Sequence, residues 1–120
     1  MRPDDDIRDM LPLTHLSFLI LLSLCGQQRH GYAIIQAVEE LSDPPITPRT
    51  GTFYSALKRM VEEGTVRPVQ TPPQSRGEDS RRRYYGITPL GRRVLAAEAG
   101  RLSSLVHAAQ ALEILPEENA

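Results

Sequence analysis

The segment RTGTFYSALKRMVEEG, residues 49–64, joins an apolar stripe to a polar face rich in hydroxyl groups and positive charge. At about 100° per residue, a helix here gathers four apolar side chains on one side: Phe53, Leu57, Met60 and Val61. The opposite side carries Thr52, Ser55, Arg59 and Glu62, with Gly51 and Lys58 beside them. Hydroxyl and ammonium groups donate hydrogen bonds to phosphates and base edges, so this face predicts recognition of a polyanion.

More cations surround this face. Arg49 and Thr50 lie in the first turn of the expected helix, where free backbone N–H groups and the helix dipole favour an anion. Residues 49–93 hold ten basic and four acidic groups, a net charge of +6, although the whole chain carries −1. Residues 1–48 carry −4 and residues 94–120 carry −3. This separation of charge fits binding to a nucleic acid.

The composition argues against catalysis and against metal binding. The chain has one cysteine, three histidines and no nucleophile elbow, phosphate loop or paired carboxylates, so we expect no enzyme, no cofactor and no metal site. Cys25 ends the apolar run LSFLILLSLCG, which is too short to span a bilayer and follows an acidic segment unlike a signal peptide. We therefore expect a cytoplasmic protein without membrane contact, in which Cys25 is an inert thiol on a buried helix.

Three helices are expected to precede residue 65. The first, over 13–25, is apolar nearly all round and therefore buried. The second ends near Ser42 and has a stripe at three-residue steps formed by Tyr32, Ile35, Val38 and Leu41. The third begins with Thr47 as its cap, followed by Pro48, and ends at Gly64.

Two strands and a last helix follow. The strands cover 65–70 and 81–88, and a long polar loop joins them as a hairpin. The period of two places Tyr85 in the core and Tyr84 at the surface. The last helix begins after Thr88, a cap followed by proline, and extends to about Leu115.

This order of elements predicts a mostly α fold with a small β-hairpin: a winged helix-turn-helix plus a C-terminal dimerisation helix. We expect an acidic extension over 1–12, a winged-helix DNA-binding domain over 13–88, and a dimerisation helix with a tail over 89–120. In such folds the third helix enters the major groove, and hairpin arginines contact the DNA backbone. The predicted DNA-binding residues are Arg49, Thr50, Thr52, Tyr54, Ser55, Lys58, Arg76, Arg81, Arg82 and Arg83.

The last helix has an apolar stripe too long for an 88-residue body to cover. Four leucines and an alanine repeat at seven-residue spacing, and Glu98 interrupts the one remaining position: Leu95, Leu102, Leu105, Ala109 and Leu112. The stripe either folds back on the first helix or packs on a second copy, and we favour the second copy.

Three sequence blocks resemble the PadR family of bacterial transcriptional regulators: LLSLCGQQRHGYAIIQAVEEL, TPRTGTFYSALKRMVEEGTV and RRRYYGITPLGRRVL. The family pattern has HGY at the second helix, a G-T-x-Y recognition helix ending in Gly, and R-x-Y-Y before T-x-x-G. The match spans residues 16–95 and implies a dimeric DNA-binding repressor. Two departures are Thr65, where the family usually has Leu, and the absence of Trp, which leaves an aromatic drug pocket unsupported.

The resemblance also implies roles for particular residues. Thr52, Tyr54, Ser55 and Lys58 match the recognition helix, and Arg83, Tyr84 and Tyr85 match the wing strand. The first and last helices form the dimer contact in the family, which adds Leu16 to the expected interface.

Several alternatives stay open. A dimer would bind a palindromic operator in double-stranded DNA, whereas a protein-interaction winged helix would use the same scaffold without DNA. A small apolar effector could enter between the first and last helices. Tyr54 either packs on the first helix or donates to a phosphate. His30 is expected to cap or pack near a helix start, Gly31 to aid helix packing, and Arg59 to pair with Glu62 or Glu63.

Overall fold

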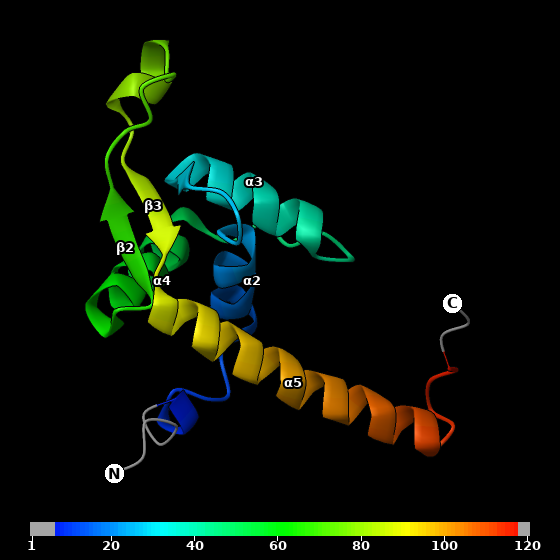
Figure 1. Ribbon diagram of the computed structural model, residues 1–120. Coiled ribbons are helices and arrows are strands. Elements are labelled where there is room, and N and C mark those ends of the chain that lie inside the picture. The colour runs from blue at the N-terminus through cyan, green and yellow to red at the C-terminus, as the bar shows by residue number, and fades with distance from the viewer. Residues whose placement is uncertain (1–6, 118–120) are drawn as a thin grey trace.

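The computed structural model describes residues 7–117 and has the expected mostly helical architecture with a small antiparallel sheet (Figure 1). Its helices are α2 (His15–Ser23), α3 (Gly31–Leu41), α4 (Thr50–Glu63) and α5 (Pro89–Ala111). Its strands are β1 (Arg29–His30), β2 (Val66–Val69) and β3 (Tyr84–Ile87), and a 3-10 helix, η1 (Gly77–Arg81), lies between β2 and β3. Residues 1–6 of the expected acidic extension and residues 118–120 of the tail lie outside the described part.

The core is built around α2, which packs against α3, α4 and α5. Ile20 and Leu21 of α2 are fully buried, as the apolar run predicts. Their neighbours include Ile34 of α3, Phe53 of α4 and Val94 of α5, all with no exposed surface. Ile7, Met10 and Leu11 also contribute to this core, so it extends into the segment that precedes α2.

The expected stripe of α3 is confirmed at Val38, which is buried, and is wrong at its two ends. Tyr32 is 55% exposed and Leu41 is 47% exposed, while Ile35 is partly buried. The buried positions are Gly31, Ile34, Ala37 and Val38. Steps of three residues turn by about 300° and drift by roughly 60° each time. Three such steps, from Tyr32 to Leu41, therefore leave the buried face, whereas alternating steps of three and four stay on it.

Two helix boundaries also differ from the predictions. The third helix, α4, has Arg49 as its N-cap and begins at Thr50, so the expected cap at Thr47 is wrong. The Ser42 hydroxyl accepts a hydrogen bond from the Ile46 N–H at 2.8 Å in the turn that follows α3, and α4 begins after this turn. The first helix ends at Ser23, and Cys25 is exposed rather than buried.

The predicted helix end at Gly64 and the predicted helix start at Thr88 are confirmed. Gly64 has a φ of 86°, the left-handed conformation that glycine adopts without strain. The Thr88 side chain accepts a hydrogen bond from the Gly91 N–H and donates one to the Gly64 carbonyl. Thr65, which stands where the family usually has Leu, is 2% exposed, and its hydroxyl donates to the Met60 carbonyl.

The sheet has three strands in the order β1-β3-β2, all antiparallel. No sequence pattern predicted β1, which is only two residues long and pairs His30 with Tyr84. The expected split of the tyrosines is reversed, because Tyr84 is 8% exposed and Tyr85 is half-buried. Strand β3 is hydrogen-bonded on both edges, and its residues Tyr84–Ile87 are buried or half-buried throughout. Because both faces of the strand are covered, alternation no longer predicts which side chain is buried.

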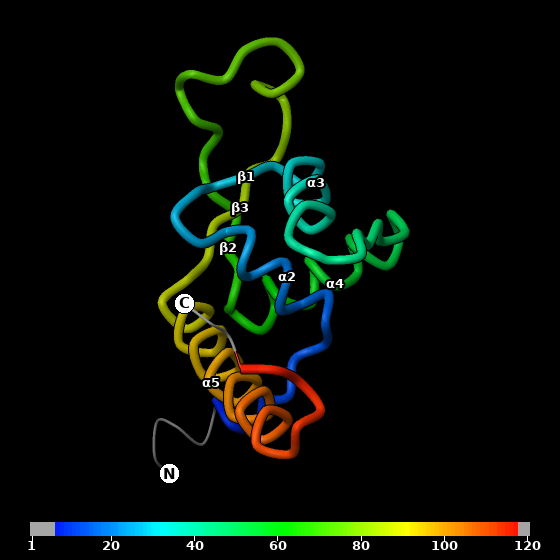
Figure 2. Tube along the Cα trace, turned by 90° about the vertical axis from the view of Figure 1, so that its right-hand side faces the viewer, coloured from blue at the N-terminus to red at the C-terminus, as the bar shows by residue number. Residues whose placement is uncertain are grey.

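The wing loop and the C-terminal half of α5 project from opposite ends of the molecule (Figures 1 and 2). The Cα radius of gyration is 16.2 Å, larger than the roughly 14 Å of a compact chain of this length. The 23 residues of α5 span about 34 Å, so only its first half reaches the body.

Glu98 fixes the first half of α5 to the segment before α2. It is 1% exposed, and its carboxylate accepts hydrogen bonds from the Leu13 N–H and from Arg101. The polar residue that interrupts the leucine pattern is therefore an internal contact of the single chain.

Gly91 and Gly100 both lie in α5, and their surroundings predict opposite effects of an alanine substitution on stability. A Cβ on Gly91 would collide with the Thr65 carbonyl oxygen and the Ile87 side chain, whereas a Cβ on Gly100 would meet nothing within 4 Å. We expect Gly91→Ala to lower the free energy of unfolding by about 1–3 kcal/mol. Gly100→Ala should raise it by roughly 0.5–1 kcal/mol. Urea denaturation measures both, and equal effects would contradict the tight junction.

Glu98 predicts a loss of stability in acid. The hydrogen bond from Arg101 lowers the pKa of the Glu98 carboxyl below its ordinary 4.5, burial opposes this, and the Leu13 N–H adds to the lowering. The folded state then binds the proton less readily than the unfolded state. The stability from this contact is complete above pH 4.5 and is lost as the pH falls through the lowered pKa. Glu98→Gln should be less stable at pH 7, and thermal melts should show this difference shrinking in acid.

Candidate nucleic-acid interface

The polar face of α4 is exposed along its length. Its buried side is formed by Phe53, Ala56, Leu57 and Met60. The predicted DNA-contacting residues of this segment are all exposed: Arg49, Thr50, Thr52, Tyr54, Ser55 and Lys58. Arg49 caps the helix without a side-chain hydrogen bond, so no capping side chain occupies the first-turn N–H groups. The start of α4 thus presents donors and positive potential to the surface.

Tyr54 packs on Gly31, the first residue of α3. Its ring meets Phe53 edge to face at 4.9 Å between centroids. A Cβ on Gly31 would lie 2.6 Å from the Tyr54 hydroxyl oxygen, so the absent side chain of Gly31 permits this contact. The contacts described for Tyr54 are with Gly31 of α3 and Phe53 of α4, and Gly31 serves helix packing as expected. Tyr54 is still 45% exposed and faces the space below the wing.

The cations differ in whether an acidic group already neutralises them. Arg59 lies 3.2 Å from Glu63 and donates to the Ser17 hydroxyl, which confirms that it pairs within the chain. Within residues 7–117, no acidic group lies within ion-pairing distance of these exposed residues: Arg49, Lys58, Arg76, Arg81 and Arg83.

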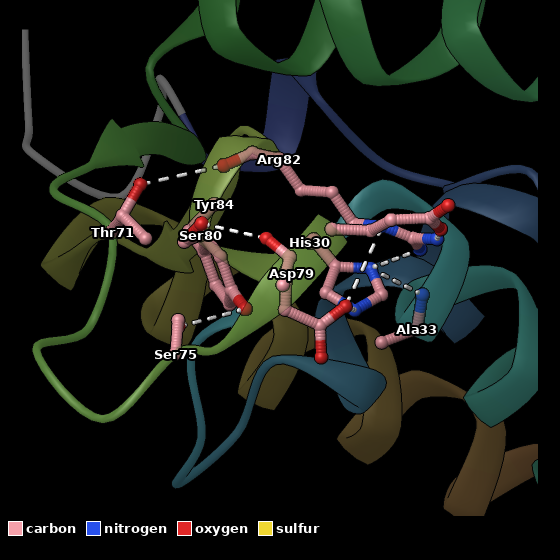
Figure 3. A network of polar contacts seen from close by, with 10 residues as sticks. His30, Ala33, Thr71, Ser75, Asp79, Ser80, Arg82 and Tyr84 are labelled. Carbon is pink, nitrogen blue, oxygen red and sulfur yellow. Dashed lines mark hydrogen bonds and ion pairs between the residues drawn. The ribbon is translucent and has the colours of Figure 1, made fainter.

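Arg82 differs from the other wing arginines because its guanidinium is already bound (Figure 3). It lies 3.4 Å from Glu78 and 3.5 Å from Asp79, both in η1. It also lies over the Tyr32 ring, 5.4 Å from the centroid. The sequence analysis placed four wing arginines together as DNA contacts, Arg76 and the run 81–83, and the structure separates Arg82 from this set.

His30 connects the same wing residues to α3. Its Nδ1 accepts a hydrogen bond from the Ala33 N–H at 3.0 Å, which confirms the expected helix cap. Its Nε2 lies 3.6 Å from Asp79. Burial lowers the pKa of His30 from its ordinary value, Arg82 lowers it further, and Asp79 opposes both. The ring is therefore neutral at pH 7 and carries its proton on Nε2, toward Asp79.

Two cavities flank Tyr54, between α3, α4 and the base of the wing. One, of about 430 Å³, is lined by His30, Gly31, Tyr32, Tyr54, Arg82, Arg83 and Tyr85. The other, of about 380 Å³, is lined by Tyr54, Leu57, Lys58, Val61, Glu62, Pro68, Arg83 and Tyr85. Because Lys58 of α4 and Arg83 of the wing line the same cavity, the two groups of cations belong to one surface.

Sequence reasoning missed the contacts that hold the wing in place. It gave no role to Glu78 or Asp79 and placed Tyr32 in the core. Only HGY at the second helix hinted at this cluster, since His30 and Tyr32 both belong to it. The pairing of the wing with the start of α3 spans about 50 residues of sequence, from His30 to Arg82, and no local periodicity reports such a contact.

The expected dimer surface is only partly available. Leu95 is 8% exposed and belongs to the core of the single chain, so its inclusion in that surface is wrong. Leu16, Leu102 and Ala109 are half-buried. Leu105 and the residues after it leave a large uncovered apolar surface: Leu105 55%, Val106 45%, Leu112 74%, Ile114 79% and Leu115 42% exposed.

The arrangement of these elements defines a winged helix-turn-helix. Helices α2, α3 and α4 pack as a trihelical unit, and the β2–β3 hairpin follows as the wing. In this class α4 corresponds to the recognition helix.

Comparison with known proteins agrees with this class and identifies the family. Residues 20–97 match the model of the transcriptional regulator PadR-like family. A PadR family transcription regulator from Clostridium difficile has a similar structure, with a TM-score of 0.68, 26% identity, and coverage of 82% of this chain and 98% of that one. A transcriptional regulator from Clostridium thermocellum shares the fold, with a TM-score of 0.59, 22% identity, and coverage of 98% and 100%.

The chain belongs to the PadR-like family of transcriptional regulators. It is also 36% identical over 87 residues to a 37.1 kDa protein in transposon TN4556 of Streptomyces fradiae, covering 72% of this chain. The match spans only 23% of that longer relative. The family consists of transcription regulators rather than enzymes. Within residues 7–117, none of the helices combines the length and the apolar character needed to cross a membrane.

Proposed function

We propose that this chain is a dimeric, sequence-specific DNA-binding regulator of PadR type that represses transcription at a palindromic operator. One observation carries the proposal: Lys58 of α4 and Arg83 of the wing line a common cavity, and neither has an acidic partner among residues 7–117. Two unpaired cations from different elements on one surface suit a phosphate backbone that passes both.

The elements suggest a division of labour on the duplex. The exposed side chains Thr52, Ser55 and Lys58 would face base edges in the major groove, because they lie opposite the buried stripe of α4. Arg49 and the uncapped N–H groups of the first turn would meet a phosphate. The wing arginines would contact the backbone and set the register: Arg76, Arg81 and Arg83.

Arg83 offers a direct test of the wing contact. Because a phosphate contact releases a counterion, Arg83→Ala should weaken binding to every sequence and reduce the salt slope of log K by about 0.9. Arg8→Ala is the matched control, since Arg8 is exposed but lies outside the basic segment. Fluorescence anisotropy at several salt concentrations, with DNA obtained by selection from random sequences, measures both slopes.

An unchanged salt slope of log K for Arg83→Ala would contradict the proposed contact between the wing and the DNA backbone. Failure of the natural chain to bind any DNA at low salt would favour the alternative, a winged-helix protein-interaction module. Ser55→Ala should instead change which sequence is preferred, because a hydroxyl facing base edges reads sequence and carries no charge.

The exposed part of α5 supports a second copy as partner. Its apolar side chains cluster beyond the point where the helix leaves the body, and an uncovered surface of this kind marks an association site. A two-fold axis between two α5 helices would place each copy against the same surface of the other. Recognition helices related in this way would bind half-sites roughly 34–36 Å apart.

A charge placed in this surface should separate the copies. We expect Leu105→Asp to convert a dimer into a monomer, since a carboxylate would be buried without a partner at the interface. Ser103→Asp adds the same charge to the opposite side of the same exposed helix and should leave the dimer intact. Sedimentation equilibrium measures the mass, and circular dichroism verifies the fold. A monomeric natural chain would contradict the proposed dimer.

Two further expectations from the sequence, a small apolar effector and a cytoplasmic location, stay predictions.

A further inference from the structure

The wing contains an arginine whose charge is neutralised by its own hairpin. Arg82 lies within 3.5 Å of the carboxylates of Glu78 and Asp79. These acidic residues follow the loop tip and are the only acidic groups between residues 64 and 97. Acidic side chains weaken binding to a polyanion, so their place in a basic wing needs a physical reason.

The cavity beside Arg82 has the chemistry of an anion site. Its walls include two guanidinium groups, from Arg82 and Arg83, and the exposed rings of Tyr32 and Tyr54. Among residues 7–117, no carboxylate lines this cavity. The anions nearest to its arginine are the wing carboxylates, and Asp79 lies 3.5 Å from Arg82 Nε and 3.6 Å from His30 Nε2. A phosphodiester carries only acceptors and a single negative charge, which matches these donors.

We propose that this cavity receives one phosphate of the DNA backbone, and that Glu78 and Asp79 are internal counter-anions of Arg82 which that phosphate displaces. The inference rests on the proposed function, because it names the contact that DNA makes at the base of the wing. It assigns to the acidic pair the role of lowering DNA affinity through one arginine.

The geometry indicates that a phosphate can replace the carboxylates at Arg82 with little loss of free energy. The distances of 3.4 and 3.5 Å are longer than the roughly 2.7–2.9 Å of strong charged hydrogen bonds. The side chains of Glu78 and Asp79 are 88% and 53% exposed, so water already screens these pairs. None of the residues of η1 is buried, and the turn can therefore shift without losing core contacts.

Arg82 itself need not move far during the exchange. Its guanidinium is held over the Tyr32 ring at 5.4 Å from the centroid, and its backbone carbonyl accepts a hydrogen bond from Thr71. The Tyr84 ring beneath the cluster is fixed by its contact with Ser75 at 3.2 Å. Figure 3 shows the side chains of Asp79 and Arg82 next to the His30 ring, with Thr71 and Ser75 farther from it. The arginine is thus positioned in advance, and only its partner changes.

A double-mutant cycle on the natural full chain tests this mechanism. Neutralising both carboxylates, Glu78→Gln with Asp79→Asn, should tighten DNA binding by about tenfold and steepen the salt slope by about 0.9, for one added phosphate contact. The same two changes in an Arg82→Ala background should alter affinity by less than about twofold, because the arginine through which they act is absent.

Glu62→Gln provides the through-space control. Glu62 is an exposed residue of α4 in the same basic segment, and it has no ion-pair partner among residues 7–117. Its effect on DNA affinity should be the same with and without Arg82. Tyr54→Phe removes one hydroxyl donor without changing charge, so it should weaken binding by about threefold and leave the salt slope unchanged. Circular dichroism verifies that each variant is folded.

Two results would overturn the inference while DNA binding persists. If neutralising Glu78 and Asp79 raised DNA affinity equally with Arg82 and with Arg82→Ala, the carboxylates would act on DNA only through space. Weaker binding after neutralisation would show that they order the wing for DNA instead of competing with it. Absence of binding by the natural chain to any DNA would overturn the proposed function itself, which separates the two failures.

Discussion

The structure depends on burying most of α2. This helix is apolar nearly all round, and its side chains are buried or half-buried except at His15 and Leu22. Helices α3, α4 and α5 each cover part of it. Because Phe53, Leu57 and Met60 of α4 are buried in the core, the hydroxyl groups and Lys58 on the other side of this helix face the solvent. The surface proposed to bind DNA is therefore a consequence of the core.

A small polar junction then links the recognition helix to the wing and to α5. Thr88 donates to the Gly64 carbonyl at the end of α4, and its backbone N–H donates to the Thr65 carbonyl. Gly91 allows α5 to start directly against Thr65. Threonine at position 65 fits because its hydroxyl is satisfied by the Met60 carbonyl. These contacts place the wing, α4 and α5 in fixed relation, which a dimeric reader of two half-sites requires.

Charge on the binding surface is governed by pairing rather than by the count of arginines. Arg59 and Arg82 have acidic partners, whereas Arg83 and Lys58 have none among residues 7–117. The carboxylates bound to the first pair compete with an anionic ligand, whereas the second pair has no such competitor among the described residues. The count of ten basic groups in the basic segment therefore overstates the number of unpaired cations that a DNA backbone would meet.

The sequence by itself determined the order of the elements, the winged-helix class, the buried and polar sides of α4, and the glycine and threonine signals at Gly64 and Thr88. These features are local, since one helix turn or one cap contains the information. It did not determine β1, the burial of Tyr84 or Leu95, or the partners of Arg82. Each of those depends on segments distant in the chain, such as His30 and Arg82. Only packing decides which long-range neighbours meet, because periodicity reports the side on which a residue lies and not what covers it.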